Sequence, residues 1–577
     1  MNLFFRLIQP VLFTTYIKSH FMKKLISLLL ILSLAPLLKP LMAQDAKQKG
    51  LDAITLQAIQ GQLEFLASDW TEGRSTGQPG AYMAADYIAS LFKVYGLQPA
   101  GDLVYERPTR QQRMSGIRPS SYRSFYQNFN LIETRAGETH ELALIETTPS
   151  GTRTQQFSYQ TDFSVQAAEV STEIEMPVVF VGYGLTDKEN GYDDFKDVDV
   201  KDRIILRLSG YPGQDDPTSK AYKTFSQAWG TGRYALMRAK NNRASELGVV
   251  GVIDVDPDNE VPESWAANLP FRVNTGNYEG EKPRDSYYET SMSIPGTEIE
   301  GGTIRITVSR RLMNELCKGT GVDPSAFREE VKNSLKPASR TLTGKTLRIK
   351  TSVDSKLIRA RNVVGVIPGK DTTEIIVIGG HYDHLGIHDG WIWNGADDNG
   401  SGTVGVMTIA KAFMAAGEQP EKTLVFCAWT GEEKGLLGSR YFSDHPYNDS
   451  KILMNLNYDM ISRDNTNDTL GNMCTMNYTR AYEVFEELAA KNVSQYDLNL
   501  DIRFRPSDRP GGGSDHSSFS RKDIPVIYFE AGFPPEYHQP DDQVELVNWE
   551  KMTNIIKVGY LNIWDLANTD WGPSGTE

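Results

Sequence analysis

The chain has 577 residues, more than one ordinary hydrophobic core organises, so two or more domains are expected. Its apolar fraction of 40% and charged fraction of 23% are typical of folded globular proteins. The net charge of −14 argues against nucleic acid as a partner, because phosphate binding needs a basic face. The three cysteines, Cys317, Cys427 and Cys474, make no disulfide framework.

The first predicted feature is a secretory signal from Met22 to Ala43. Two lysines precede an apolar stretch from Leu25 to Leu38, and a small residue follows at Ala43. Leu41 departs from the small residue preferred near the cleavage site, and residues 1–21 form an upstream extension. The apolar stretch is short for a membrane span, which needs about 20 residues. We therefore expect a periplasmic or secreted protein that has no stable membrane insertion after the signal is removed.

Residues 51–100 have the apolar spacing of helices, with a second helix expected from about Ala81 to Tyr95. Between the two helices, Gly73–Gly77 (GRSTG) formally matches the G-x-S-x-G elbow of serine hydrolases. That elbow needs a buried strand before the serine and a helix directly after it. Here a helical pattern precedes the segment and Pro79 follows it, so we interpret Gly73–Gly77 as a loop.

From about residue 120 to 350 the pattern is β-rich. Apolar runs at 176–182, 203–208 and 249–255 are bounded by turn residues and predict strands, and residues 234–247 predict a helix before the third. This middle block contains no cluster of metal-ligand side chains.

From about residue 351 strands alternate with helices. Strands are predicted at 373–379, 422–429, 452–458 and 524–530, and helices at 401–416 and 435–443. Cys427 lies inside the second of these strands and reads as a small buried hydrophobe. The alternation predicts an α/β fold with a mainly parallel central sheet flanked by helices.

Acidic and imidazole side chains follow the predicted strands, at the sheet edge where ligands bind in such folds. They come from five separate segments, which carry His381, Asp383 and His384, then Asp397 and Asp398, then Glu432 and Glu433, then Asp459, and finally Tyr537 and His538. Carboxylates brought so close repel one another unless cations lie between them. The mixed oxygen and nitrogen set suits zinc, although manganese or cobalt could occupy it. Five protein ligands favour two metals over one.

Other polar residues of this region are not expected to bind metal. We expect Asp397 to cap the following helix, His384 and His388 to be loop histidines, and Asp541 and Asp542 to order the loop of His538. For His516, a place in the substrate pocket and an ordinary hydrogen-bonded role both remain open.

The stretches GGHYDH, GADDNGSG, TGEEKGLLGS, NYDMI, GGSDHSSF and YHQPDD occur in this order between residues 379 and 542. They closely resemble the co-catalytic zinc aminopeptidase family, which includes leucine-type aminopeptidases, glutamate carboxypeptidase II and the inactive transferrin receptor. Within the middle block, the GYGL and FKDVDVKDRIILRL stretches are similar to an inserted protease-associated domain. The resemblance implies a signal and extension at 1–43, the first part of the peptidase domain at 44–165, the protease-associated insertion at 166–345, and the second part at 346–577.

The same resemblance implies a role for each site residue. His381 and Asp459 would hold one zinc ion, Glu433 and His538 the other, and Asp398 would bridge them. Glu432 would be the general base that takes a proton from a metal-bridging water. Asp383 would hydrogen-bond His381 and fix its tautomer. Tyr537 would donate to the oxyanion or, alternatively, only pack beside His538. The peptide bond between Asp398 and Asn399 would be cis.

The predicted function is that of a secreted or periplasmic aminopeptidase, a di-zinc hydrolase that removes N-terminal residues from a peptide substrate. A carboxypeptidase similar to glutamate carboxypeptidase II is the closest alternative, and it would need basic residues such as Arg503, Arg505, Arg509 or Arg521 to hold a free carboxylate. A non-catalytic binding protein of the same fold is a further alternative. All five ligands and Glu432 are present, which argues against it.

Overall fold

The computed structural model describes residues 45–115, 120–159, 161–165, 171–230, 233–255, 290–297, 303–388 and 390–573. The expected signal at residues 1–43 lies outside these ranges. None of the helices in the described part of the chain is both long and apolar enough to cross a bilayer. The fold is mixed α/β, built around one 16-stranded sheet.

The main lobe, residues 45–100 and 360–573, carries the parallel strands predicted from the apolar runs. They lie in the order β22, β19, β15 and β18, all parallel to one another. Their bounds are β15 Asp371–His381, β18 Lys422–Trp429, β19 Lys451–Tyr458 and β22 Val526–Glu530. Two antiparallel neighbours extend the sheet, β20 Met473–Thr479 beside β22 and β14 Arg340–Ile367 beside β18. Beyond β20 lies β21 Asp501–Ser507, which is parallel to β20.

Both faces of this sheet are covered by helices, as its apolar strands require. On one face, Ile376 and Ile378 of β15 join the large core formed with six helices. These helices are α2 Ala46–Asp52, α3 Leu56–Leu66, α4 Pro79–Tyr95, α10 Gly402–Ala416, α12 Val484–Gln495 and α14 Trp549–Ala567. On the other face, Ile375 and Val377 join a smaller core with α11 Leu437–Asp444 and α13 His516–Ser520. Cys427 is fully buried in this second core, as predicted.

The middle lobe, residues 161–255 and 303–335, has its own core. Its parallel strands are β7 Thr172–Phe180, β10 Ile204–Leu208, β11 Gly251–Val255 and β13 Ile304–Val308. The accompanying helices are α6 Lys220–Trp229, α7 Arg233–Glu246, α8 Arg310–Cys317 and α9 Pro324–Ser334. The predicted strands of this region therefore form, with boundaries shifted by a few residues.

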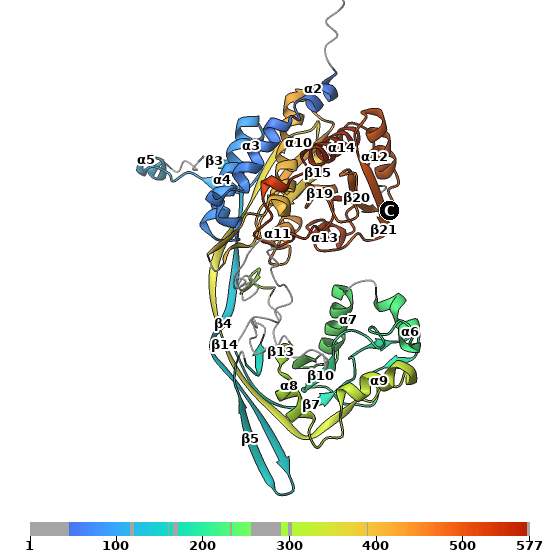
Figure 1. Ribbon diagram of the computed structural model, residues 1–577. Helices are drawn as coiled ribbons and strands as arrows, with labels where there is room; N and C mark the ends of the chain where they lie inside the picture. The colour runs from blue at the N-terminus through green and yellow to red at the C-terminus, as the bar shows by residue number, and fades with distance from the viewer. Residues whose placement is uncertain are drawn as a thin grey trace, which may run out of the picture.

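Two long antiparallel strands join the lobes. β4 spans Tyr126–Thr148 and pairs with β14 along most of its length. Figure 1 shows the pair running from the main lobe at the top to the middle lobe at the bottom, with the β5 hairpin (Gly151–Phe157) extending beyond. The sequence indicated a β-rich region here but not the length of these two strands.

Candidate metal centre

The predicted ligands meet at the carboxyl ends of the parallel strands. His381 is the last residue of β15, Asp459 follows β19 directly, and Glu432 and Glu433 follow β18. Asp398 lies in the turn before α10, and the peptide bond between Asp398 and Asn399 is cis, as the resemblance implied.

One group of side chains surrounds the ring of His381. Its Nε2 lies 3.4 Å from Asp459 Oδ1 and 3.9 Å from Glu432 Oε2. The ligand atoms of His381, Glu432 and Asp459 all lie within 4.8 Å of one another, and all three residues are buried. These three side chains could hold a metal ion.

A second group lies beside the first. His538 Nε2 is 3.1 Å from Asp398 Oδ2 and 3.3 Å from Glu433 Oε2. The other oxygen of Asp398, Oδ1, is 3.6 Å from His381 Nε2. Asp398 thus presents one oxygen to each group, the arrangement that a bridging ligand needs.

His384, interpreted from the sequence as a loop histidine, belongs to the site instead. It is fully buried, and its Nδ1 lies 2.8 Å from Glu433 Oε1, so the ring nitrogen donates to the carboxylate oxygen that faces away from His538. His384, Asp398 and Glu433 also form a group that could hold a metal ion. His388 is not in the loop that was expected for it: it is the last residue of the short strand β16 (Gly386–His388), and its ring Nε2 lies 2.6 Å from Leu385 O.

The tautomer of His381 is fixed by Asp383, although not in the way that was expected. The Nδ1–H donates to the backbone carbonyl of Asp383 at 3.1 Å, while the carboxylate oxygen Oδ1 is 3.7 Å away. The carboxylate instead accepts hydrogen bonds from the Glu432 backbone N–H and from the Thr76 hydroxyl. Because Nδ1 carries the proton, the lone pair of Nε2 faces the carboxylates.

Hydrogen bonds of three polar side chains, two of them in the turn itself, hold the turn that carries Asp398. Asp542 accepts from the backbone N–H groups of Asp397 and Asp398 at 3.0 Å each, so it orders this turn more directly than the loop of His538. Asn399 donates to the carbonyl of Tyr458, next to Asp459, at 2.9 Å. The expectation that Asp397 caps α10 is wrong, because its carboxylate accepts from the backbone and hydroxyl of Ser462.

Burial and neighbouring charges shift the pKa values of several side chains in the site. Burial lowers the pKa of His381, but Asp459 and Glu432 outweigh it and raise that pKa well above its usual range. Burial raises the pKa of Glu432 well above its usual range, with Glu433 adding to the effect against the opposition of His381. Burial also lowers the pKa of His538, yet Glu433 and Asp398 together raise it to about 10. A cation among these groups would relieve the repulsion of their carboxylates.

The residues fit a divalent metal. His381 Nε2 and Asp459 Oδ1 are buried and have no hydrogen-bond partner among the described residues, and each faces the centre of the first group. Buried polar atoms are otherwise almost always paired. Imidazole nitrogen with carboxylate oxygen and no thiolate is a donor set that zinc accepts in open sites.

Several other predicted residues lie around the centre. Tyr537 is partly buried and its ring stacks on His538 at 3.9 Å between centroids. His516 is buried against Tyr528, where burial lowers the pKa of its ring to about 3. Arg503 and Arg509 are exposed and form ion pairs with Asp501 and Asp523.

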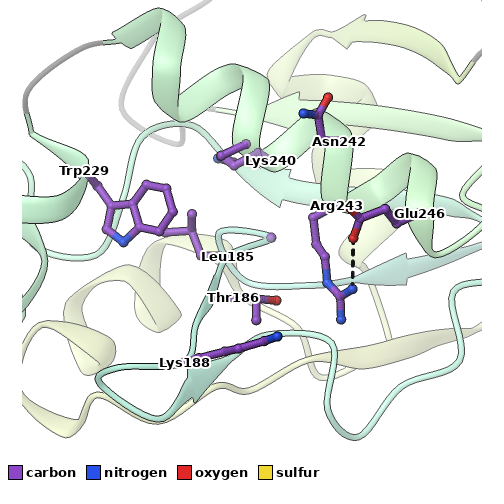
Figure 2. Close-up of a pocket in the computed structure, with 10 residues that line it drawn as sticks. Leu185, Thr186, Lys188, Trp229, Lys240, Asn242, Arg243 and Glu246 are labelled. Carbon is purple, nitrogen blue, oxygen red and sulfur yellow. Dashed lines mark hydrogen bonds and ion pairs between the residues drawn. The ribbon is translucent and has the colours of Figure 1, made fainter. Parts of the chain in front are cut away.

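A separate pocket of about 350 Å³ lies in the middle lobe and takes no part in this centre. Figure 2 shows its lining residues on the segment around β8 (Thr186–Asp187) and on helix α7, where Arg243 and Glu246 form an ion pair.

Two residues that were not predicted from the sequence contact the loops that carry the proposed ligands. Arg74 and Thr76, from the GRSTG loop, are buried and bind the loops that carry the ligands. Their glycine-rich context gave no local signal of this contact, because the partners lie about 300 residues further along the chain.

The chain is similar to known peptidases. Residues 362–560 match the family described as Peptidase family M28. A probable leucine aminopeptidase of Trichophyton verrucosum is 31% identical over 222 residues, which cover 34% of this chain and 55% of the relative. A glutamate carboxypeptidase 2 homolog of Caenorhabditis briggsae is 27% identical over 378 residues, which cover 58% of this chain and 46% of the relative. The chain thus spans about half the length of these curated relatives.

The solved structure of an aminopeptidase from Aneurinibacillus sp. strain AM-1 superposes with a TM-score of 0.53. The alignment covers 90% of this chain and 96% of that one at 17% identity, which shows a shared fold.

Proposed function

We propose that the protein is a metal-dependent aminopeptidase that uses two zinc ions. Residues 362–560 match the model of peptidase family M28, which supports the proposal. The observation that carries the proposal is the convergence of two ligand groups that share Asp398, with Glu432 beside them. The names of the relatives, a probable leucine aminopeptidase among them, support the same reaction class.

One zinc ion would be held by His381 and Asp459 and the other by Glu433 and His538, with Asp398 between them. Zinc ions bound there would polarise the scissile carbonyl and acidify water, which is the chemistry that such ions supply in hydrolases. Manganese or cobalt would suit the same donors.

Glu432 is the residue proposed to move protons. It is buried, its Oε2 points toward His381 at 3.9 Å, and its backbone N–H is anchored on Asp383. A carboxylate fixed at the edge of the ligand groups can take a proton from the attacking water and return it to the leaving amine. Tyr537, stacked on His538, would donate its hydroxyl to the oxyanion.

The middle lobe is proposed to be a protease-associated insertion, and a strand between its two stretches of chain is proposed to border the metal centre. This strand, β12 (Thr290–Ser293), pairs with β4, and Lys434 Nζ donates to the carbonyl and hydroxyl of Thr290 at 3.0 Å each. Lys434 follows Glu433 directly, so the strand approaches the metal centre. Export to the periplasm or medium is proposed from the signal pattern at Met22–Ala43, and N-terminal sequencing of the mature protein would test it.

The experiment measures hydrolysis of two peptide sets, one acetylated at the N-terminus and one amidated at the C-terminus, with and without a zinc chelator. Protein carrying Glu432→Gln is the matched control for contaminating peptidases. Chelator-sensitive release from only the free-amine set is the expected result. Cleavage that requires a free carboxylate would assign a carboxypeptidase, and zinc binding with no turnover of either set would refute the exopeptidase assignment.

A further inference from the structure

We propose that the loop Gly73–Gly77, the GRSTG stretch that resembles a serine-hydrolase elbow, positions the metal-binding loops through Arg74 and Thr76. The inference rests on the proposed function, because it concerns how that same site is held together. Neither residue is proposed to touch the metals or the substrate.

Arg74 is the first anchor. It is a fully buried guanidinium that donates to four backbone carbonyls and to no carboxylate among the described residues. Nε donates to Tyr382 O at 2.7 Å, between His381 and Asp383 in the chain. The two terminal nitrogens donate to Asn394 O at 2.6 Å and Gly395 O at 2.8 Å, just before the turn that carries Asp398. One side chain therefore fixes the spacing of two ligand-bearing loops.

Thr76 is the second anchor, and it connects two further parts of the site. Its hydroxyl donates to Asp383 Oδ2 at 2.9 Å and accepts from the Gly431 backbone N–H at 3.0 Å. Asp383 Oδ1 in turn accepts from the Glu432 backbone N–H at 3.2 Å. The loop of Glu432 and Glu433 is thus tied to the loop of His381 through one buried hydroxyl.

The backbone of the segment is fitted between these loops. Gly73 has φ +64°, and a Cβ there would lie 2.5 Å from both Gly386 O and Trp393 O. Only glycine allows this approach in this conformation. The close fit explains why the stretch has the glycine of a hydrolase elbow without its strand–turn–helix context.

Charge supports the same assignment. Burial lowers the pKa of the Arg74 guanidinium to about 10. The negative charges of Asp542, Asp398, Asp383 and Glu433 oppose this shift, because they favour the charged form. A buried cation behind a group of carboxylates stabilises their charged forms, which are the forms that bind metal.

The test measures the zinc affinity of the full-length Thr76→Val and Thr76→Ser variants and of the wild type. Metal-free protein competes for zinc with a chromophoric chelator. Valine preserves the shape of Thr76 and removes its hydroxyl, whereas serine keeps the hydroxyl. Residues that orient metal ligands typically change affinity by about 10- to 100-fold when removed. We expect that loss for Thr76→Val, and Thr76→Ser should recover zinc affinity to within a few-fold of the wild type.

Thr71→Val is the matched control. Thr71 lies in the same segment, is fully buried, and donates its hydroxyl to Leu66 O and Ser68 O, away from the ligand loops. It should leave zinc affinity unchanged. Equal weakening by Thr71→Val and Thr76→Val would show general loosening and overturn the inference.

Arg74→Lys provides a second, independent variant that keeps the charge but cannot donate to all four carbonyls. It should weaken zinc binding at least as strongly as Thr76→Val. Wild-type affinity in both variants would defeat the inference while leaving the proposed function intact. A wild-type protein that binds no zinc would defeat the proposed function itself, so the two failures are distinguishable.

Discussion

At the scale of residues, the site depends on which atom each side chain presents. His381 presents the lone pair of Nε2, because its Nδ1–H donates to the Asp383 carbonyl. Glu433 presents Oε2 toward His538 while Oε1 accepts from His384. Asp398 presents one oxygen to each ligand group. These contacts distinguish the proposed metal ligands from the residues that orient them.

The first prediction separates the adjacent residues Glu432 and Glu433. Glu432→Gln should retain two zinc ions per chain and lower kcat by about 100-fold or more, because a positioned general base contributes that much. Glu433→Gln should instead lose zinc at one position. Metal analysis together with steady-state kinetics checks both variants. Collapse of metal content in Glu432→Gln alone would mean that the two roles are exchanged.

The second prediction concerns His384. His384→Phe removes the donor to Glu433 Oε1 and should weaken zinc binding by about 10- to 100-fold, as expected for a residue that orients a ligand. His388→Phe, four residues further along the chain in β16 and outside the ligand groups, is the control. Isothermal titration of metal-free protein measures both, and equal affinities would contradict a role for His384.

Most of the proposed metal ligands could be named from the sequence because they lie at or after the end of a recognisable apolar strand, whereas Asp398 precedes helix α10. His384 was misjudged because nothing in its local pattern reports burial beside Glu433. Arg74 and Thr76 could not be found, since their partners are brought close only by the packing of the N-terminal segment on the main lobe.

At the scale of elements, the parallel strands of the main lobe are predictable because they are buried on both sides and read as continuous apolar runs. β4 and β14 were harder, because their polar and apolar residues mix over more than 20 positions with no break that marks their length. Helix α14 was not predicted, although it fills one side of the largest core.

The packing of α14 on β19 gives a third prediction. Gly559 faces Tyr458, and a Cβ there would lie 1.6 Å from the tyrosine hydroxyl, which donates to Ile555 O. Gly559→Ala should destabilise the main lobe by about 1–3 kcal/mol through overpacking. Gly61→Ala in α3 has open space around it and should stabilise by about 0.5–1 kcal/mol. Urea unfolding compares the two, and equal effects would contradict the packing.

A fourth prediction concerns the strands of the middle lobe. Burial raises the pKa of Asp194 from 3.8 to about 7, against hydrogen bonds from Leu185 N, Tyr192 Oη and Tyr183 N. The folded state thus keeps a proton that the unfolded chain releases above pH 3.8. Stability contributed by this proton is complete at low pH and is lost as pH rises to about 7.

Amide hydrogen exchange of β7 and β10 at pH 5 and pH 7.5, corrected for intrinsic rates, measures this loss. Wild-type protein should be less protected at the higher pH, and Asp194→Asn should reduce the difference. An unchanged pH dependence in Asp194→Asn would assign the effect to other groups.

At the scale of the whole molecule, the main lobe is assembled from two distant stretches of chain. Helices α3 and α4 pack on α10, and the loop between them supports the metal centre. The chain then leaves along β4, forms the middle lobe and returns along β14 (Figure 1). The family match at 362–560 contains all five proposed ligands, yet the loops that carry them are also held by residues 73–77. The support from residues 73–77 could not be predicted from the motifs, because all the motifs lie in the second of the two stretches of chain that form the main lobe.

The most direct test of the central claim is the zinc stoichiometry of reconstituted protein, measured by mass spectrometry for the wild type and for Asp398→Asn, which has the same shape but lacks the bridging charge. The wild type should hold two zinc ions per chain, and Asp398→Asn should lose both, because the groups around His381 and His538 share this carboxylate. A wild-type protein that holds one zinc ion or none, or an Asp398→Asn variant that keeps two, would contradict a shared two-metal centre.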